Sequence, residues 1–210
     1  MIVPISKIIN KAKKQGYAVG AFNTSNLEIT LAIIRAAVAQ KSPVIIQTSQ
    51  SAIKYSNNET LFAIMTTLAN TVGKSVPIAI HLDHGKDFGM IKDCINVGYN
   101  SVHIDASEEK FDKNIKLTKQ ITKLAHKKKL WVQAELGAIL GKEGMLKLKT
   151  GEINMEEMMT DPAEAAEFVA QTKVDTLAIA VGTIHGHFKG IEKVDQPRLQ
   201  EIAKLVKVPL

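Results

Sequence analysis

The segment PIAIHLDHG (77–85) ends an apolar run with two histidines, an aspartate and a glycine. Burying imidazole and carboxylate groups side by side costs free energy unless partners satisfy them. In a strand, His81 and Asp83 share one face, and we expect His84 to lie in the following turn. Neutral imidazole is a zinc ligand, and a nearby carboxylate can orient it or act as a base. Two interpretations remain open: the start of a metal site, or a buried hydrogen-bonded pair of His81 and Asp83 in which His81 is structural.

A second candidate segment is VGTIHGHFKG, in which His185 follows an apolar run. Its glycines let backbone N–H groups come close to a ligand. The alternative is a glycine-rich loop with exposed histidines, and His187 fits that alternative better. If both runs are strands of one sheet, His84 and His185 end at the same edge, which predicts a metal site.

Carboxylates follow two more apolar runs. Glu135 ends a run in AELGAILGKEG, and Glu143 lies in the long loop after it, which could close as a lid carrying an acid or base. As an alternative, Glu143 is a solvated loop residue. Asp105 ends the run SVHIDAS, where it can either bind a metal or cap the next helix together with Ser107.

These side chains need a scaffold that brings several strand ends together. Apolar, β-branched runs alternate with stretches of helical apolar spacing, which predicts a parallel sheet with right-handed crossovers and strands buried on both faces. The expected strands are 17–23, 43–49, 77–83, 101–106, 130–137 and 175–183; the expected helices are 27–40, 59–73, 90–98, 114–127 and 162–172.

The candidate polar residues fall at or just past the carboxyl ends of these strands. One polar group from each of six strands favours a TIM (β/α)8 barrel over an open sheet, and no dinucleotide or P-loop glycine motif follows any strand. A further helix and the first residues of a seventh strand are expected at 197–210. Because a barrel usually takes about 250 residues, we predict a single, incomplete barrel domain over 1–210 with about the first six strand–helix units.

Composition excludes several classes. The net charge of +6 comes almost wholly from lysine, with arginine at Arg35 and Arg198, and aromatic residues make up 5%. This pattern does not predict nucleic-acid binding, but it suits an anionic metabolite such as a sugar phosphate. No apolar run reaches the roughly 18 residues of a membrane span, so no membrane partner is expected. The one cysteine, Cys94, is expected to be a packed thiol, which favours a reducing cytoplasm.

In this order, the motifs resemble those of class II, metal-dependent ketose-bisphosphate aldolases, which include fructose- and tagatose-1,6-bisphosphate enzymes. The resemblance runs from end to end and is carried by GYAVGAFNTSNLE, SPVIIQTSQSAIKY, PIAIHLDHG, SVHIDASE, VQAELGAILGKEG, TDPAEAAEFV and DTLAIAVGTIHGHFKG. The rival Schiff-base chemistry needs a desolvated lysine on a strand. The six expected strands contain no lysine.

The resemblance implies roles in proton transfer and zinc binding. His84 and His185 would be ligands of a catalytic Zn²⁺. Asp83 would exchange a proton with the C4 oxygen of the substrate, and Glu143 would transfer a proton at C3 of the ketose phosphate.

The resemblance also implies a second group of contacts. Asp105 and Glu135 would hold metal in an alternative or second position, which allows a second divalent or a monovalent cation. Ser49 would contact the aldehyde half of the substrate and Gly186 the dihydroxyacetone-phosphate half, while Asn23 would face the substrate.

Three departures from the family pattern stand out. Gln133 and Gly144 occupy positions where acids are common, and the third zinc histidine and the phosphate-binding loops of the family would fall after Leu210. These 210 residues by themselves are therefore expected to bind zinc weakly.

The resemblance implies a fructose-1,6-bisphosphate aldolase that forms a homodimer or homotetramer. The closest alternative is a tagatose-1,6-bisphosphate aldolase. The alternative from another class is a truncated, non-catalytic paralogue or structural partner.

Overall fold

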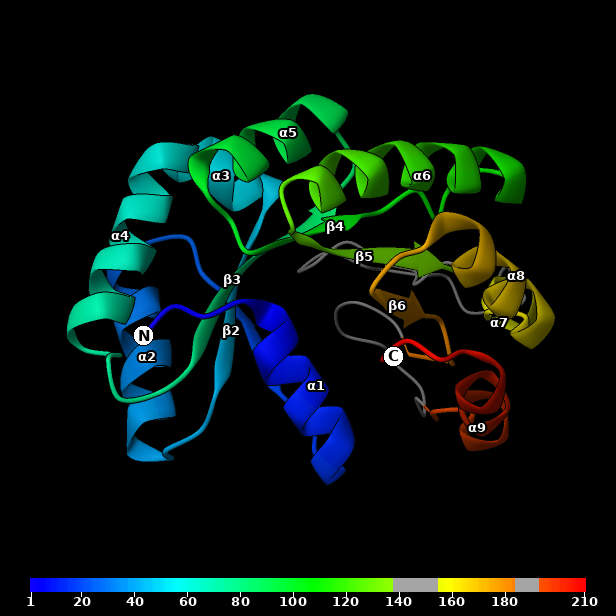
Figure 1. Ribbon diagram of the computed structural model, residues 1–210, viewed down its shortest axis with the longest axis horizontal. Coiled ribbons are helices and arrows are strands. Elements are labelled where there is room, and N and C mark those ends of the chain that lie inside the picture. The colour runs from blue at the N-terminus through cyan, green and yellow to red at the C-terminus, as the bar shows by residue number, and fades with distance from the viewer. Residues whose placement is uncertain (138–154, 184–192) are drawn as a thin grey trace.

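A computed structural model of the protein describes residues 1–137, 155–183 and 193–210. Its sheet is parallel throughout, in the order β1-β2-β3-β4-β5-β6, which confirms the predicted parallel sheet. Figure 1 shows the sheet curving into a half-barrel with helices around its outside. The strands are β1 (Gly20–Asn23), β2 (Val44–Ser49), β3 (Ile78–Gly85), β4 (Ser101–Ile104), β5 (Trp131–Leu136) and β6 (Thr176–Ile179).

The helices alternate with these strands along the chain. The bounds are α1 (Ile5–Gln15), α2 (Leu27–Ala39), α3 (Gln50–Ser56), α4 (Asn58–Thr71), α5 (Phe88–Val97), α6 (Phe111–Lys127), α7 (Met155–Met158), α8 (Pro162–Thr172) and α9 (Gln196–Leu205). The expected helices correspond to α2, α4, α5, α6, α8 and α9, whereas α1, α3 and α7 were not predicted. The start of α8 follows from its sequence, because the Asp161 side chain accepts a hydrogen bond from the Glu164 N–H group.

One face of the sheet packs against the outer helices and forms the main core. On β2 to β6, most alternate strand residues are apolar and buried on this face, and burial of each such side chain stabilises the fold by about 1.5–3 kcal/mol. Large helix side chains from α4, α5, α6 and α8 complete the layer. The strand members include Val44, Ile46, Ile78, Ile80, Val102, Val132 and Leu177, and the helix members include Leu61, Met65, Ile91, Ile121 and Phe168.

The inner face is also buried on β4 and most of β3, as predicted, but it is not apolar throughout. Near the amino ends of the strands, Ile45 and Ala79 pack against Ile5 and Ile8 of α1, which lies inside the arc of helices in Figure 1. Nearer the carboxyl ends, the inner face is polar and lines a cavity of about 280 Å³. Its polar members are Gln47, His81, Asp83, His84, His103, Gln133, Glu135 and Thr176.

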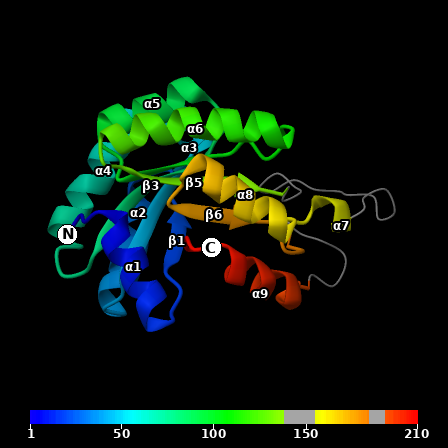
Figure 2. The ribbon, with the colours of Figure 1, turned by 45° about the vertical axis from the view of Figure 1, so that its right-hand side comes forward.

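One edge of the sheet also differs from expectation. All of β1 is exposed, and the residues before Gly20 are not part of the strand, so the predicted strand at 17–23 is too long and is not buried. At the other edge, the Leu177 N–H group donates a hydrogen bond to the Pro209 carbonyl. Figure 2 shows the chain end next to β6, where the seventh strand was expected to begin. Within the described residues, no helix has the length and hydrophobicity needed to cross a membrane.

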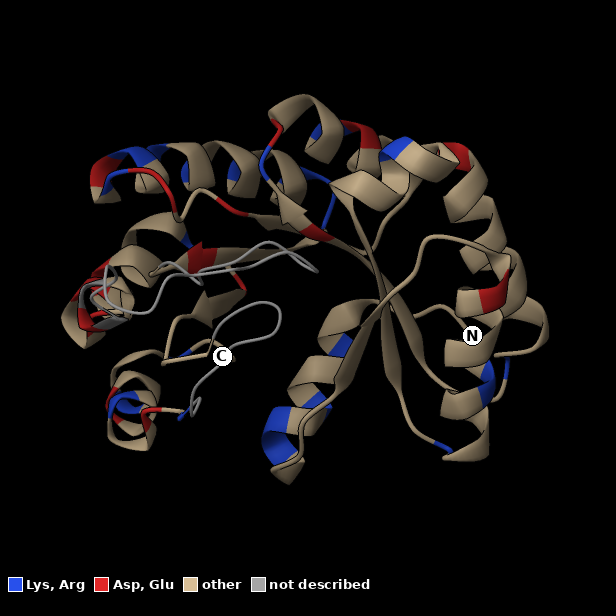
Figure 3. Ribbon diagram, turned by 180° about the vertical axis from the view of Figure 1, so that it is seen from behind, with Lys and Arg blue, Asp and Glu red and all other residues tan. Residues whose placement is uncertain are grey.

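Basic and acidic residues differ in where they occur in the fold. Figure 3 shows lysine and arginine mainly on the helices and their connections, whereas acidic segments also occur at the ends of strands. The thiol of Cys94 is buried, as predicted, and burial raises its pKa to about 12.

Candidate functional site

The candidate site begins at an irregularity near the end of β3. Leu82 pairs with Val102 and Gly85 with Ile104, so three steps along β3 match two along β4. Such a bulge interrupts the alternation of side chains. The prediction that His84 lies in a turn is wrong, because it is a strand residue with a positive φ of 46°.

Glycine is required directly after this bulge. A Cβ atom on Gly85 would lie 2.5 Å from the His103 carbonyl oxygen, a backbone atom that cannot move freely. The close approach of β3 and β4 therefore accounts for the glycine of the HLDHG motif.

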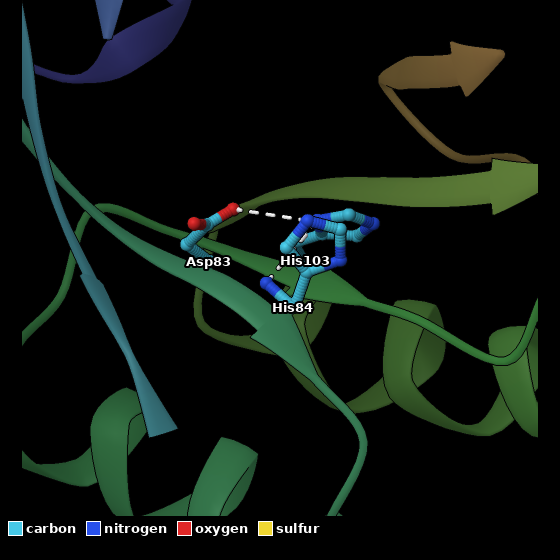
Figure 4. Close-up of side chains that lie close together, drawn as sticks. All are labelled: Asp83, His84 and His103. Atoms are coloured by element: carbon cyan, nitrogen blue, oxygen red, sulfur yellow. Dashed lines mark hydrogen bonds and ion pairs between the residues drawn. The ribbon is translucent and has the colours of Figure 1, made fainter. Parts of the chain in front are cut away.

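The bulge places the His84 imidazole among three carboxylates. His84 Nδ1 lies 2.9 Å from Asp105 Oδ2 and 3.5 Å from Glu135 Oε2, and His84 Nε2 lies 3.8 Å from Asp83 Oδ1. Figure 4 shows Asp83 and His84 next to each other on β3, with His103 close to both. The structure thus brings together four of the predicted site residues.

These contacts shift the pKa values of the cluster. The hydrogen bond to Asp105 is the largest cause that raises the pKa of His84 to about 9; burial opposes it, and Asp83 and Glu135 add to it. Burial, together with the charge of Asp105, raises the pKa of Glu135 to about 7. Burial alone would raise the pKa of Asp105, but hydrogen bonds from His84 and Ser107 lower it below its ordinary value. The His84 imidazolium therefore helps to hold these carboxylates together in the metal-free protein, as does Lys86, whose Nζ lies 3.8 Å from Asp105 Oδ2.

Asp83 is held on its other side by an amide relay. Asn23 Nδ2 donates to Asp83 Oδ2 at 2.8 Å, and Gln47 Nε2 donates to Asn23 Oδ1 at 2.7 Å. The relay fixes one carboxylate oxygen and leaves Oδ1 facing His84. Ser49 is paired with Asp83 in the register of β2 and β3, where its Oγ accepts a hydrogen bond from the Ala52 N–H group at the start of α3.

Two sequence alternatives are now decided by hydrogen bonds. His81 and Asp83 do not bond each other, since His81 Nδ1 lies 2.7 Å from Ser101 Oγ and Asp83 bonds Asn23. Asp105 does not cap α6, which begins six residues later; its Oδ1 accepts instead from the N–H and hydroxyl groups of Ser107.

His103 is a site residue that the sequence analysis did not single out. It lies on β4, buried, with Nδ1 accepting a hydrogen bond from the His84 N–H group at 3.4 Å. Its Nε2 lies 3.4 Å from Glu135 Oε2. The signal was its two-residue spacing from Asp105, which places both side chains on one face of the strand.

Three predicted residues, Glu143, His185 and Gly186, lie outside the described residues, as does His187. The catalytic zinc site that pairs His84 with His185 therefore stays a prediction, and so do the lid role of Glu143 and the substrate contact of Gly186.

The described residues include two groups of side chains that could hold a cation. Ligand atoms of His84, Asp105 and Glu135 all lie within 4.8 Å of one another, and so do those of Asp83, His84 and His103. One imidazole and two carboxylates form a donor set that Zn²⁺ accepts. Glu135 Oε2 is buried and makes no hydrogen bond to any described group. Buried polar atoms are normally satisfied, so this oxygen fits the role of a cation ligand.

Comparison with known proteins gives one consistent result. A sequence model of the family described as "Fructose-bisphosphate aldolase class-II" matches residues 3–210. Proteins named fructose-bisphosphate aldolase from Helicobacter pylori and Thermus caldophilus are 40% and 41% identical over 212 residues, which cover 100% of this chain and 67% of each relative. The crystal structure of the YdjI aldolase from Escherichia coli K12 superposes with a TM-score of 0.86 at 32% identity, covering 100% of this chain and 72% of that one.

Proposed function

This chain belongs to the class II fructose-bisphosphate aldolase family, and on that premise we propose that it catalyses the zinc-dependent, reversible cleavage of fructose 1,6-bisphosphate. The products are dihydroxyacetone phosphate and glyceraldehyde 3-phosphate. The observation that carries the proposal is the juxtaposition of Asp83, a proton-transfer group, with the cation-binding donors His84, Asp105 and Glu135 at the carboxyl ends of β3, β4 and β5. In barrels of this kind, that edge is where catalytic groups lie.

Asp83 and His84 divide the work between proton transfer and cation binding. Asp83 lines the cavity and accepts the proton of the C4 hydroxyl as the C3–C4 bond breaks, then returns it in the condensation direction. Asn23 orients the Asp83 carboxylate through its hydrogen bond.

His84, with His185, holds the catalytic cation, while Asp105 and Glu135 offer the second position. A bound divalent cation supplies polarisation of the substrate carbonyl and stabilises the negative charge that bond cleavage leaves beside it. Because a metal binds the neutral imidazole, His84 would hold the cation in its deprotonated form.

The remaining proposed roles concern the substrate and its surroundings. Ser49 and Gly186 contact the two halves of the sugar bisphosphate, and Glu143 exchanges the proton at C3. The protein acts as a homodimer or homotetramer. A mildly basic surface suits a substrate with two phosphate groups.

The test compares metal content and turnover in matched variants. Asp83→Ala is expected to lower turnover by about 10²–10⁴-fold while metal stays bound, whereas His84→Ala is expected to release the metal. His126→Ala is the control, because this histidine lies on the surface and bonds Asp175. A chelator should abolish activity, and borohydride with substrate should not; the opposite pattern would exclude metal-dependent chemistry.

Substrate choice between the C4 epimers needs its own assay. Fructose 1,6-bisphosphate and tagatose 1,6-bisphosphate differ in configuration at the carbon whose oxygen Asp83 is proposed to serve. A coupled assay for triose phosphate, run with each epimer, is expected to give the higher kcat/KM with the fructose compound. A higher value with the tagatose compound would reverse the assignment and leave the cleavage chemistry intact.

A further inference from the structure

Two buried polar atoms face each other without a hydrogen bond at the inner edge of the cluster. His103 Nε2 and Glu135 Oε2 lie 3.4 Å apart, and neither atom has a hydrogen-bond partner among the described residues. The His103 and Glu135 residues are 3% and 2% exposed, so water does not satisfy them readily. Unsatisfied polar atoms at such depth are rare in native proteins and indicate a functional constraint.

The other ring nitrogen of His103 determines which way its proton points. His103 Nδ1 accepts a hydrogen bond from the His84 N–H group, which the bulge in β3 directs toward β4. A neutral imidazole has one N–H group, so the proton of His103 is on Nε2. The ring is neutral because a nitrogen that accepts a hydrogen bond cannot itself carry a proton. The Nε2–H group therefore lies next to the Glu135 carboxylate, with Nε2 3.4 Å from Oε2.

We propose that His103 is a positioning residue, whose Nε2–H group holds the Glu135 carboxylate in place for a divalent cation bound by His84, Asp105 and Glu135. This inference rests on the proposed function for the cation, but the contact itself does not. His103 is not a ligand in this arrangement, because its Nε2 carries a proton.

The need for a positioning residue follows from the contacts of Glu135. Glu135 Oε2 lies 3.5 Å from His84 Nδ1, so His84 helps to hold it. A cation bound by both residues would take the ring nitrogen that faces Glu135, and that contact would then be lost. The His103 Nε2–H group is neutral and buried, so it remains available to Glu135 in both states. Outer groups of this type orient ligands and tune their affinity for metal.

The first test reads the tautomer directly. Long-range ¹H–¹⁵N spectra of the metal-free protein are expected to show His103 Nε2 protonated and Nδ1 unprotonated, with Nε2 still protonated after Co²⁺ is added. Protonation on Nδ1 would overturn the contact, and loss of the Nε2 proton on metal addition would make His103 a ligand.

The second test measures the effect on cation affinity. His103→Met fills similar space without a donor, and His103→Gln restores an N–H group near the position of Nε2. His81→Met is the matched control, because His81 is equally buried on the inner face but bonds Ser101 and does not contact Glu135. Co²⁺ titrations, followed by absorption and by competition with a chelator, are expected to show a 10–100-fold loss of affinity for His103→Met, and near-normal affinity for His103→Gln and His81→Met.

The outcomes separate the two proposals. Equal affinity in the wild type and His103→Met would overturn the positioning role even if the enzyme is an aldolase. Equal losses in His103→Met and His81→Met would also overturn it, since the effect would then be one of general packing. Failure of the wild type to bind Co²⁺ would overturn the cation site itself, and the tautomer would still show whether His103 donates to Glu135.

Discussion

Raising the pH from 7 to 9 is expected to destabilise the metal-free protein through one residue, His84. Its folded pKa of about 9 lies above its ordinary value of 6.5, mainly because of the hydrogen bond to Asp105. A group whose pKa is higher in the folded state stabilises folding fully at a pH below its unfolded pKa. That contribution is lost as the pH rises through the folded pKa, because the imidazolium then releases its proton in the folded protein as well.

The magnitude follows from the two pKa values. A change from 6.5 to about 9 corresponds to at most about 3 kcal/mol of stability below pH 6. Linkage between these values places a loss of about 2 kcal/mol between pH 7 and pH 9. The pKa of Glu135 is raised from 4.5 to about 7, so most of its effect on stability falls between pH 4.5 and pH 7. The pKa of the Cys94 thiol is raised from 9.0 to about 12, so its effect falls mainly above pH 9.

The assay is urea unfolding in the presence of a chelator at a series of pH values, with His84→Asn as the control. Asparagine tolerates a positive φ, so the variant keeps the backbone of the bulge and removes the titrating ring. The free energy of unfolding of the wild type should fall by about 2 kcal/mol more than that of His84→Asn between pH 7 and pH 9. Parallel curves would refute the assignment of a protonated His84 bound by carboxylates, as would a His84 pKa near 6.5 measured by NMR.

Three further changes test other contacts of the fold and site. Gly85→Ala is expected to destabilise by about 1–3 kcal/mol in urea unfolding and to weaken Co²⁺ binding, because the new Cβ would meet the His103 carbonyl; unchanged unfolding and Co²⁺ titrations would contradict this packing argument. Phe168→Ala is expected to cost about 3–5 kcal/mol in the same unfolding assay, since Phe168 is fully buried; the exposed Phe22→Ala should stay within about 0.5 kcal/mol, and equal losses would contradict the assigned core. Asn23→Ala should lower turnover without loss of metal, because it removes the hydrogen bond that orients Asp83; unchanged turnover would separate the amide relay from catalysis.

Hydrophobic patterning was sufficient to predict the parallel sheet and most helices. The outer face of the sheet is mainly apolar on β2 to β6, with Thr48 as a polar member, and that regularity dominates the sequence signal. The extent of the polar inner face was not predicted, because its polar residues are interleaved with the apolar ones and many are satisfied by neighbours from other strands. Helix α1 was not predicted, although Ile5, Ile8 and Ala12 are buried. Lysines and other polar residues make up most of the remaining positions of this helix. Those apolar positions carry a helical period that could have predicted it.

Local sequence predicted which residues gather at the strand ends, but it did not predict their mutual geometry. Asp83, Asp105 and Glu135 were each placed by the end of an apolar run, and the structure brings them around His84. Whether Asp105 caps the next helix depended on where α6 begins, and the sequence analysis did not fix that position; its role as a metal ligand stays a prediction. The neighbours of His103 lie on β3 and β5. The residue pattern of one strand does not predict which side chains it will meet on two neighbouring strands.

The bulge in β3 explains how neighbours in sequence can share one site. A regular strand would direct Asp83 and His84 to opposite faces, yet their side chains approach to 3.8 Å and both line the same cavity. A positive φ at a residue other than glycine costs about 1–3 kcal/mol and persists only where the surroundings impose it. Here the His84 N–H group bonds His103, its ring bonds Asp105, and Gly85 lets β4 approach. The strained residue is thus the one whose displacement puts the carboxylate proposed for proton transfer beside the proposed cation ligand, which argues that the bulge is part of the site and not a defect of the sheet.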